Sequence, residues 1–216
     1  MTPDSSYRYE LKYVLQRHEW HDLMEVLMFH PAGFSILYPE RWVNNIYFDD
    51  LDFSACQSNL SGISDRIKFR YRWYGDVSAW SEGIIEKKVK HNSLGFKEYI
   101  KAQTVKDYKA LLKFVRDIDF TTQLQPSIQN RYLRQYYIDR SQKFRLTIDD
   151  HLSYNSALLN EGPQDMGFAS EVDDRIIVEL KFNKADVDSF ESINNYFPFR
   201  LAKHSKYVTG VMAMLH

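Results

Sequence analysis

Residues Arg66-Ile67-Lys68-Phe69-Arg70-Tyr71-Arg72-Trp73-Tyr74 form the stretch that decides the fold. In a β-strand, successive side chains point to opposite faces, so the four cations share one face and the apolar and aromatic residues share the other. Such an apolar face packs against a core. The cations then lie in a row about 7 Å apart, and neighbours repel by about 2 kcal/mol at an effective dielectric of about 20. The row therefore indicates either a solvated charged face or a strand that binds a polyanion.

Length and composition favour a single domain. With 216 residues, 44% of them hydrophobic and 15% aromatic, the chain can bury a large core. Glycine and proline are scarce, at 8 and 6 residues, and no stretch rich in Ser, Gly or Pro divides the sequence. We therefore expect one domain over residues 1–216.

Charge is balanced overall, with 28 Lys and Arg against 29 Asp and Glu and a formal net charge of -1. Proteins that coat nucleic acid are normally basic, so this balance argues against a nucleic-acid partner. Because cations are nevertheless concentrated in one stretch, acidic residues must cover the outside. This distribution favours an enclosed anion site over an open nucleic-acid surface.

Cysteine content and hydropathy bear on the compartment. The single cysteine, Cys56, excludes an internal disulfide and has no metal-ligand spacing around it, so we expect a small buried residue. The N-terminal residues have no apolar segment of the signal-peptide type, and no run reaches the roughly 18 apolar residues of a membrane span. The sequence predicts a soluble cytoplasmic protein without a transmembrane segment.

The hydrophobic period alternates between strand-like and helix-like values along the chain. Strands are predicted over residues 7–15, 43–49, 65–74, 80–90, 127–139, 143–149 and 175–182, with the tail of a hairpin at 97–100. Helices are predicted over 17–30, 104–118, 186–197 and 205–215, a short helix or turn over 50–60, and loop over 151–174. These elements predict an α+β fold built on an antiparallel sheet or barrel.

Three predicted strands carry a glutamate and a lysine on one face, two residues apart: Glu10 and Lys12, Glu86 and Lys88, Glu179 and Lys181. On a fourth strand, Arg145, Thr147 and Asp149 share a face. An ordinary half-exposed sheet shows the same alternation, so a single strand of this kind is weak support for a site. In a closed barrel, however, one face must point inward. If that is the ionised face, the lumen is lined by cations and several carboxylates.

A lumen of this kind has a definite chemical use. Arginine and lysine bind phosphate oxygens through charge-assisted hydrogen bonds. Carboxylates among them can hold Mg²⁺ or Mn²⁺, which bridges phosphate oxygens while the cations stabilise the charge that develops in phosphoryl transfer. The sequence has no Gly-rich phosphate loop or Walker motif. Phosphate would therefore be bound by side chains rather than by backbone amides.

Eight short motifs occur in one order along the chain. They are Arg8-Tyr9-Glu10-Leu11-Lys12-Tyr13, Ile46-Tyr47-Phe48-Asp49, Arg66 to Gly75, Glu86-Lys87-Lys88, Tyr132-Leu133-Arg134, Arg145-Leu146-Thr147-Ile148-Asp149, Val178-Glu179-Leu180-Lys181 and Lys203-His204-Ser205-Lys206-Tyr207. In this order the chain resembles the VTC-type polyphosphate polymerase domain, a branch of the triphosphate tunnel metalloenzymes, or CYTH superfamily. The resemblance runs from about residue 7 to residue 211.

The resemblance implies an eight-stranded antiparallel β-barrel, a triphosphate tunnel, with a few short helices packed outside. It implies a phosphotransferase that moves the γ-phosphate of ATP onto a growing inorganic polyphosphate chain, releases ADP and requires Mn²⁺ or Mg²⁺. The expected partners are ATP or triphosphate and polyphosphate. Better-known members of the family are tied to membranes through extra domains, so a membrane partner protein is compatible with the resemblance.

The resemblance also implies site residues, carried over by matching motif. The main phosphate-handling set is Lys12, Arg70, Arg72, Lys88, Arg134, Arg145, Lys203 and Lys206. Further phosphate contacts are Arg66, Lys68, Lys97 and Ser205. Glu179 matches the metal-ligand glutamate, with Glu10 and Glu86 as helpers.

One position departs from the hydrolytic members of the superfamily. Those enzymes open with Glu-x-Glu-x-Lys, whereas position 8 here is Arg. The change removes a metal ligand and adds a phosphate contact, which agrees with the polymerase branch. The alternatives are an inorganic or nucleoside triphosphatase of the same fold and a non-catalytic polyphosphate-binding module.

Overall fold

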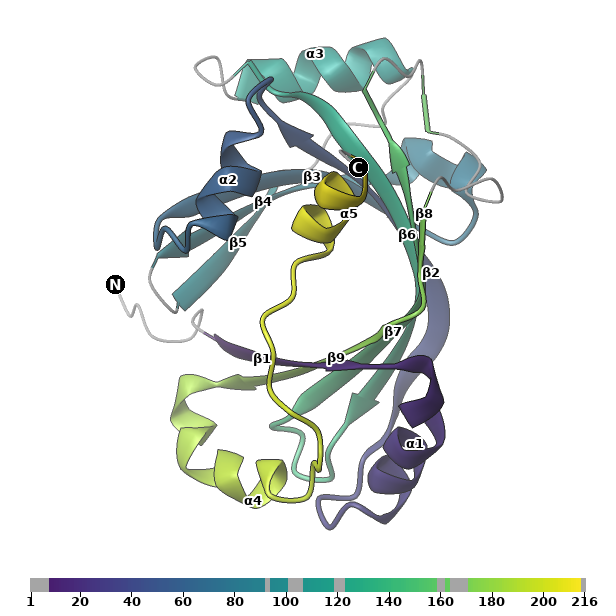
Figure 1. The fold of residues 1–216 in the computed structure, drawn as a ribbon, viewed down its shortest axis with the longest axis vertical. Coiled ribbons are helices and arrows are strands. Elements are labelled where there is room, and N and C mark those ends of the chain that lie inside the picture. The colour runs from purple at the N-terminus through teal and green to yellow at the C-terminus, as the bar shows by residue number, and fades with distance from the viewer. Residues whose placement is uncertain are drawn as a thin grey trace. The chain divides into compact units, whose positions relative to one another are not determined.

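The computed structural model describes residues 8–91, 94–100, 107–118, 123–158, 162–163 and 171–214. The strands are β1 (Arg8–Leu15), β2 (Ser35–Asp49), β3 (Arg66–Tyr74), β4 (Ile84–His91), β5 (Leu94–Ile100), β6 (Gln125–Ile138), β7 (Arg145–Ser156), β8 (Glu171–Asp173) and β9 (Ile176–Asn183) (Figure 1). The α-helices are α1 (Trp20–Phe29), α2 (Ser54–Leu60), α3 (Tyr108–Ile118), α4 (Phe190–Asn194) and α5 (Lys206–Met214). Short 3₁₀ helices are η1 (Arg17–Glu19), η2 (Val77–Glu82) and η4 (Lys184–Ser189).

Eight strands join in one antiparallel sheet in the order β1-β9-β7-β6-β2-β3-β4-β5, and β8 pairs with β7. The alternation of ionised and apolar residues along these strands decides which face packs. In the pairs β1-β9, β9-β7 and β3-β4, ionised residues lie opposite one another on the same face. The predicted fold class, α+β on an eight-stranded antiparallel sheet with short helices, is confirmed.

The chain divides into two compact units, each assembled from three segments. Unit 1 comprises the described residues of Met1–Arg41, Leu133–Leu152 and Asp173–His204. Unit 2 comprises those of Trp42–Tyr132, Ser153–Val172 and Ser205–His216. Strands β2, β6 and β7 contribute residues to both units. The expectation of one domain over residues 1–216 stays a prediction.

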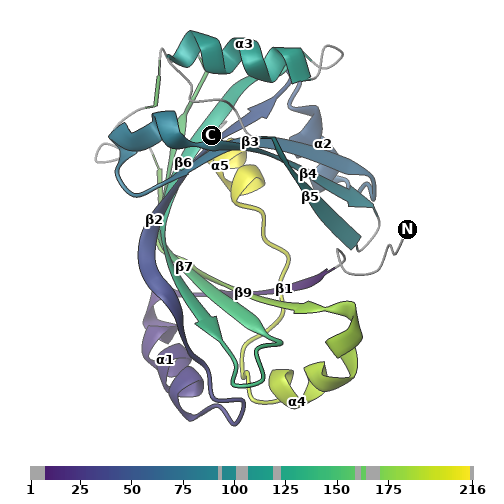
Figure 2. The same cartoon turned by 180° about the vertical axis from the view of Figure 1, so that it is seen from behind.

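Unit 1 packs its core on the apolar face of β1, β9 and β7. Tyr13, Leu146, Val178 and Leu180, which are fully buried, are among its members. In Figures 1 and 2, α1 and α4 both cover this face. The apolar residues of α1 recur at helical spacing, which is why this helix buries one side and exposes the other.

Unit 2 packs its core on the apolar face of β3. Phe69, Tyr71 and Trp73 are buried there with residues of α3, as the period-two pattern predicts. Helix α5 lies against β6 and β7, where a Cβ at Gly210 would come within 2.5 Å of Ile128 Cδ1. Only glycine permits this close approach.

Several element boundaries differ from the sequence-based expectation. Residues 151–156 form the end of β7 rather than loop, because strand pairing outweighs their small polar side chains. Strand β2 begins at Ser35, eight residues before the prediction, since its exposed first half carries no alternating apolar signal. Residues 80–82 belong to η2 and not to a strand. The predicted start of α3 at Thr104 lies outside the described residues.

Cys56 is buried and free, as expected. In the described part of the chain, no helix combines the length and the apolar character needed to cross a membrane.

Candidate functional site: an arginine cluster and a glutamate cluster

The cationic face of β3 has polar partners on both neighbouring strands. Arg70 lies opposite Tyr47 of β2 and Glu86 of β4. Arg72 lies opposite Asn45 of β2. Residues directly opposite in an antiparallel pair point to the same face. The predicted ionised face of this stretch is therefore present in unit 2.

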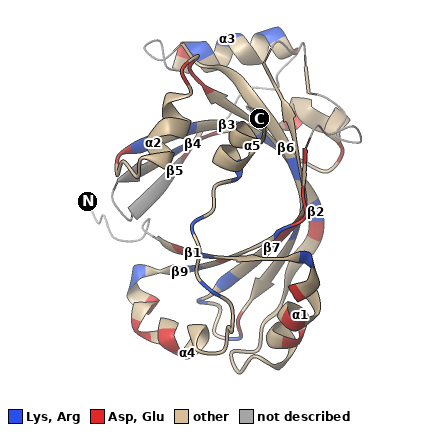
Figure 3. Ribbon diagram, in the orientation of Figure 1, with Lys and Arg blue, Asp and Glu red and all other residues tan. Residues whose placement is uncertain are grey.

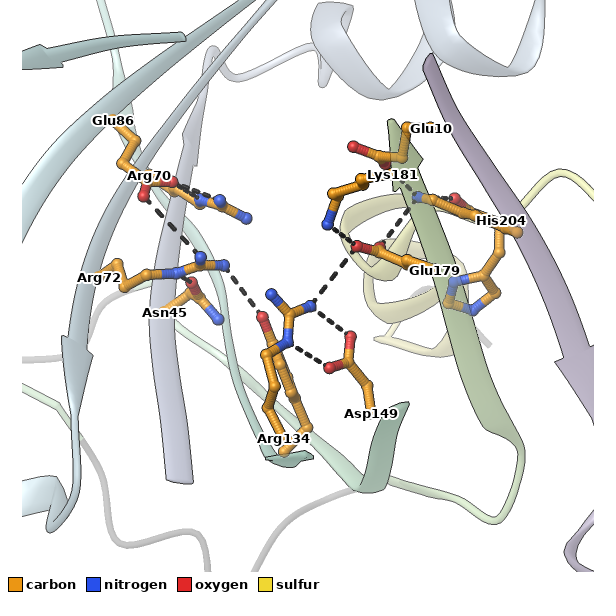
Figure 4. Close-up of polar contacts among 12 residues, drawn as sticks. Glu10, Asn45, Arg70, Arg72, Glu86, Arg134, Asp149, Glu179, Lys181 and His204 are labelled. Atoms are coloured by element: carbon orange, nitrogen blue, oxygen red, sulfur yellow. Dashed lines mark hydrogen bonds and ion pairs between the residues drawn. The ribbon is translucent and has the colours of Figure 1, made fainter. Parts of the chain in front are cut away.

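These side chains form what we call the arginine cluster. Its members are Asn45, Tyr47, Arg70, Arg72, Glu86, Tyr132 and Lys206, all in unit 2. Arg70 Nε donates to Glu86 Oε2 at 2.5 Å (Figure 4). Arg72 Nε donates to Asn45 Oδ1 at 2.7 Å, and Nη2 donates to the Tyr132 hydroxyl at 3.0 Å. Both guanidinium forks are thus held before any ligand arrives.

The arginine cluster carries more positive than negative charge. It contains three cations, from two arginines and Lys206, against the single carboxylate of Glu86. Arg72, Glu86 and Lys206 are 6%, 5% and 8% exposed, so water dilutes this charge little. An anion that reached the cluster would relieve the repulsion.

Tyr47 reports on the field inside the arginine cluster. Burial raises the pKa of its hydroxyl, whereas the adjacent charges of Arg70 and Arg72 lower it, and the net pKa lies below the ordinary value. Arg70 Nη1 also donates to this hydroxyl at 3.5 Å. The cationic field is strong enough to outweigh burial of the phenol.

Further lysines line the same strands. Lys68 lies opposite Lys88, and Lys88 lies opposite Lys97 in the backbone register, so three lysine positions cross β3, β4 and β5 in one row. The side chain of Lys97 is outside the described residues. Arg66 at the start of β3 donates weakly, at 3.4 Å, to Asn59 Oδ1.

Ser205 connects this row to α5. Its Oγ accepts from Lys68 Nζ at 3.0 Å and from the Val208 backbone N–H at 3.4 Å. The serine therefore caps the helix and contacts a lysine of β3 at the same time. Lys206, the next residue, has its Nζ 4.8 Å from the ring centroid of Tyr132.

A buried carboxylate fixes the start of α5. Asp49, 2% exposed, accepts from the backbone N–H groups of Ala55 and Cys56 in α2 at 3.0 and 3.2 Å. The Tyr207 hydroxyl also donates to Asp49. Burial and this carboxylate raise the pKa of Tyr207. Tyr207 in turn stacks on Tyr47, with ring centroids 5.1 Å apart.

The ionised face of unit 1 forms a second group, the glutamate cluster. Its members are Glu10, Lys12, Arg134, Asp149, Glu179 and Lys181. Lys12 Nζ lies 3.2 Å from Glu10 Oε1 and 3.4 Å from Glu179 Oε1, and donates to the His204 carbonyl at 2.9 Å (Figure 4). Burial lowers the pKa of Lys12, but Glu179 and then Glu10 outweigh it and raise the pKa above its ordinary value.

Arg134 and Lys181 complete the glutamate cluster. Arg134 donates to both oxygens of the fully buried Asp149, at 2.5 and 2.6 Å. Its Nη2 lies 3.6 Å from Glu179 Oε2. Lys181 Nζ donates to the same oxygen at 2.5 Å. Three cations here face three carboxylates, so this cluster is balanced whereas the arginine cluster is not.

Two predicted site residues are exposed. Arg145, the first residue of β7, lies opposite Lys181 in the register, but its side chain reaches solvent. Lys203 precedes α5 and is also exposed. The remaining predicted cations of units 1 and 2 whose side chains are described are buried or half-buried. Acidic residues are concentrated on α1 and around α4 (Figure 3).

The described carboxylates could hold a divalent ion only as a pair. Within the described ranges, no group of three or more His, Cys, Asp or Glu side chains is placed to hold a metal ion. Glu10 and Glu179 share Lys12 as a partner. Such a pair fits Mg²⁺ or Mn²⁺, because these ions bind one or two carboxylates and complete their shell with water and substrate phosphates. Glu86 instead holds the two arginines of unit 2.

Three neutral or acidic residues hold arginines although none is in the predicted set of phosphate and metal residues; of these, Asp149 was expected on the ionised face and Asn45 and Tyr132 were not. Asn45 and Tyr132 hold Arg72, and Asp149 holds Arg134. A signal for Asn45 exists: Asn44 and Asn45 stand between the apolar Val43 and Ile46 of β2, both amides are 0% exposed, and a buried amide needs a polar partner.

Comparison with known structures shows the class of fold. PH1819 from Pyrococcus horikoshii OT3 is 13% identical and has a TM-score of 0.53, over 97% of this chain and 100% of that chain. A protein from Vibrio parahaemolyticus is 11% identical with a TM-score of 0.53, over 95% and 99%. HpAC1 from Hippeastrum, for which a dominant triphosphatase activity is described, is 12% identical with a TM-score of 0.50, over 94% of each chain. The sheet of this chain therefore has the same fold as these three proteins.

The family follows from the sequence match. The model of the VTC domain matches residues 7–215, and the chain therefore belongs to the VTC domain family. No curated protein matches it.

Proposed function

We propose that this VTC domain is a metal-dependent polyphosphate polymerase. It transfers the γ-phosphate of ATP to a growing inorganic polyphosphate chain and releases ADP. The observation that carries the proposal is the arginine cluster, in which the buried Arg72 and the adjacent Arg70 are held in place by Glu86, Asn45 and Tyr132. Membership of the VTC family supports the same reaction class.

Arg70 and Arg72 bind the transferring phosphoryl group. In phosphoryl transfer the protein contributes positioning and electrostatic stabilisation rather than covalent chemistry. Guanidinium groups fixed before the reaction stabilise developing charge without reorganisation. Lys206, Lys68 and Lys88 bind further phosphates of the chain. Outer contacts are assigned to Arg66, Lys97, Arg145, Lys203 and Ser205.

Glu179 would hold the divalent ion, with Glu10 as its helper. When bound, the ion would offset negative charge on the phosphates. Lys12 stays beside these two carboxylates because of its bond to the His204 carbonyl. Arg134, fixed by Asp149, lies on the other side of Glu179. Glu86 is assigned to orienting the arginines rather than to the metal.

Product analysis tests the proposal. The full chain is incubated with ATP and Mn²⁺, and ADP, phosphate and polyphosphate are separated on a gel and by chromatography. We expect ADP and a phosphate chain, with little free phosphate. If ADP and free phosphate form without a polyphosphate chain, the protein is a triphosphatase and not a polymerase. Tight tripolyphosphate binding without ADP would indicate a binding module.

Glu179→Gln separates catalysis from binding. The substitution keeps shape but removes the charge that attracts the metal. A polymerase should lose turnover while retaining tripolyphosphate affinity within a few-fold. Lys143→Gln is the matched control, because Lys143 forms its ion pair with Asp186 in the same unit.

A further inference from the structure

The carboxylate of Glu179 is crowded by cations. Lys181 Nζ lies 2.5 Å from Oε2, Lys12 Nζ lies 3.4 Å from Oε1, and Arg134 Nη2 lies 3.6 Å from Oε2. A divalent ion bound by this carboxylate must share it with like charges or displace one of them. The three cations differ in how easily they can leave.

Lys12 and Arg134 are anchored. Lys12 Nζ donates to the His204 carbonyl and also pairs with Glu10. Arg134 makes a bidentate pair with Asp149, which is 0% exposed. Moving Arg134 would remove two hydrogen bonds from the fully buried Asp149, and moving Lys12 would break both its hydrogen bond to the His204 carbonyl and its ion pair with Glu10.

Lys181 is held less tightly. In the part of the chain that the structure describes, its ion pair is with Glu179, and its side chain is 24% exposed. It lies opposite Glu10 on one side and Arg145 on the other in the register of β1, β9 and β7. Glu10 attracts the ammonium toward the carboxylates, whereas the side chain of Arg145 reaches solvent.

We propose that Lys181 is a built-in counter-cation of Glu179, which takes the place of the divalent ion and swings out toward solvent when the ion binds. The proposal rests on the proposed function in one respect, the assignment of Glu179 as metal ligand. Lys181 is then a positioning residue that sets the metal affinity. It keeps the carboxylate neutralised in the absence of metal and raises the ion concentration needed to load the site.

The sign of the effect follows from the charges. In the wild type, Mn²⁺ must break an ion pair before it binds. Partly exposed pairs of this kind contribute up to about 1 kcal/mol, so Lys181→Met should tighten Mn²⁺ binding roughly three- to fivefold. Lys181→Arg keeps the charge and should keep the affinity within about twofold.

The experiment measures Mn²⁺ binding to the full chain without nucleotide, by the electron paramagnetic resonance signal of free Mn²⁺. The variants are Lys181→Met, Lys181→Arg, Glu179→Gln and the control Lys143→Met, whose lysine pairs with Asp186 at 3.4 Å in the same unit. Thermal unfolding checks that each variant is folded. We expect tighter binding for Lys181→Met alone, and loss of the site in Glu179→Gln.

The outcomes separate this proposal from the proposed function. Suppose that folded Lys181→Met binds Mn²⁺ no more tightly than the wild type, while Glu179→Gln loses the site. The role of Lys181 as counter-cation is then wrong, and Glu179 is still supported as the metal ligand. Binding that survives Glu179→Gln, or no binding to any variant, overturns both the counter-cation and the metal assignment. If Lys143→Met tightens Mn²⁺ binding as much as Lys181→Met does, the effect comes from the change in net charge, and the proposal is overturned. If Lys181→Met fails to fold, a weakening beyond twofold in Lys181→Arg overturns it, and wild-type affinity there supports it.

Discussion

At the scale of single residues, the type of hydrogen-bond partner decides whether the charge of an arginine remains available to bind phosphate. Arg72 is held by the amide of Asn45 and the hydroxyl of Tyr132, and only at 3.8 Å by Glu86. Neutral acceptors fix the guanidinium without cancelling its charge. The charge therefore remains available to a phosphate, unlike that of Arg134, which Asp149 neutralises with two hydrogen bonds.

Arg72→Met should weaken tripolyphosphate binding by about ten- to a hundredfold, because one charge-assisted contact of about 1.5–3 kcal/mol is lost. Isothermal titration at low salt measures the change. Arg131→Met is the matched control: Arg131 lies in the same unit beside Trp42, 4.1 Å from its ring, one residue from Tyr132 along β6. Equal losses in both variants would contradict the assignment of the binding face.

The sequence predicted the paired residues of the site better than its edges. The two-residue period placed Glu10 with Lys12, and Glu179 with Lys181, on one face of each strand. The register adds what the period could not give, namely that Lys12 lies opposite Glu179 and Arg70 opposite Glu86. The period also placed Arg145 on the ionised face, but at the first residue of a strand the side chain can turn to solvent. The two-residue period does not predict which side chains at the end of a strand turn to solvent. It also gives no distances between strands that are far apart in the sequence.

At the scale of elements, α5 is tied to β2 and α2 through one carboxylate. Asp49 ends β2, accepts two N–H groups of α2 and the Tyr207 hydroxyl of α5. Ser205 and Lys206 stand at the beginning of α5, so their positions follow from this junction. The sequence predicted α5 but not its anchor, because a partner 158 residues away leaves no local signal.

Tyr207→Phe should lower the free energy of unfolding by about 1–3 kcal/mol, since a buried carboxylate loses a donor. For a chain of this length that corresponds to a fall in Tm of about 2–12 °C. Tripolyphosphate affinity should fall with it, because Lys206 and Ser205 lose their support. Tyr38→Phe, at an exposed tyrosine, should change neither quantity. If Tyr207→Phe is as stable as the wild type, the hydrogen bond between Tyr207 and Asp49 does not anchor α5.

Helices and strands with a clear hydrophobic period were predicted closely. Strand segments that depend on pairing with neighbouring strands were not. β3 has strong alternation and agrees with its predicted bounds to one residue, and the helix predicted over 17–30 is η1 followed directly by α1. The second half of β7, with only Leu152 and Tyr154 as apolar residues, is a strand because neighbouring strands complete its hydrogen bonds. That information is not local in the sequence.

At the scale of the whole molecule, a nearly neutral chain keeps a concentrated positive charge. The net charge of -1 includes an arginine cluster with three cations against one carboxylate. The repulsion within that cluster opposes folding unless an anion is bound. Ligand binding to the folded state should therefore be visible as stability.

Tripolyphosphate should raise the Tm. At a concentration a hundred times its Kd the stabilisation is about 2.7 kcal/mol, or roughly 5–10 °C. The gain should shrink as salt is added, because screening weakens the ion contacts. Sodium chloride at matched ionic strength is the control in a differential scanning measurement. A gain that is independent of salt would be inconsistent with an electrostatic site.

A crystal structure with tripolyphosphate and Mn²⁺ tests the central claim most directly: that the ionised strand faces bind a chain of phosphates. We predict phosphate density against the guanidinium groups of Arg70 and Arg72, with Lys206 in contact, and the metal on Glu179. Phosphates bound only at exposed lysines, with Arg70 and Arg72 in contact with none, would contradict it.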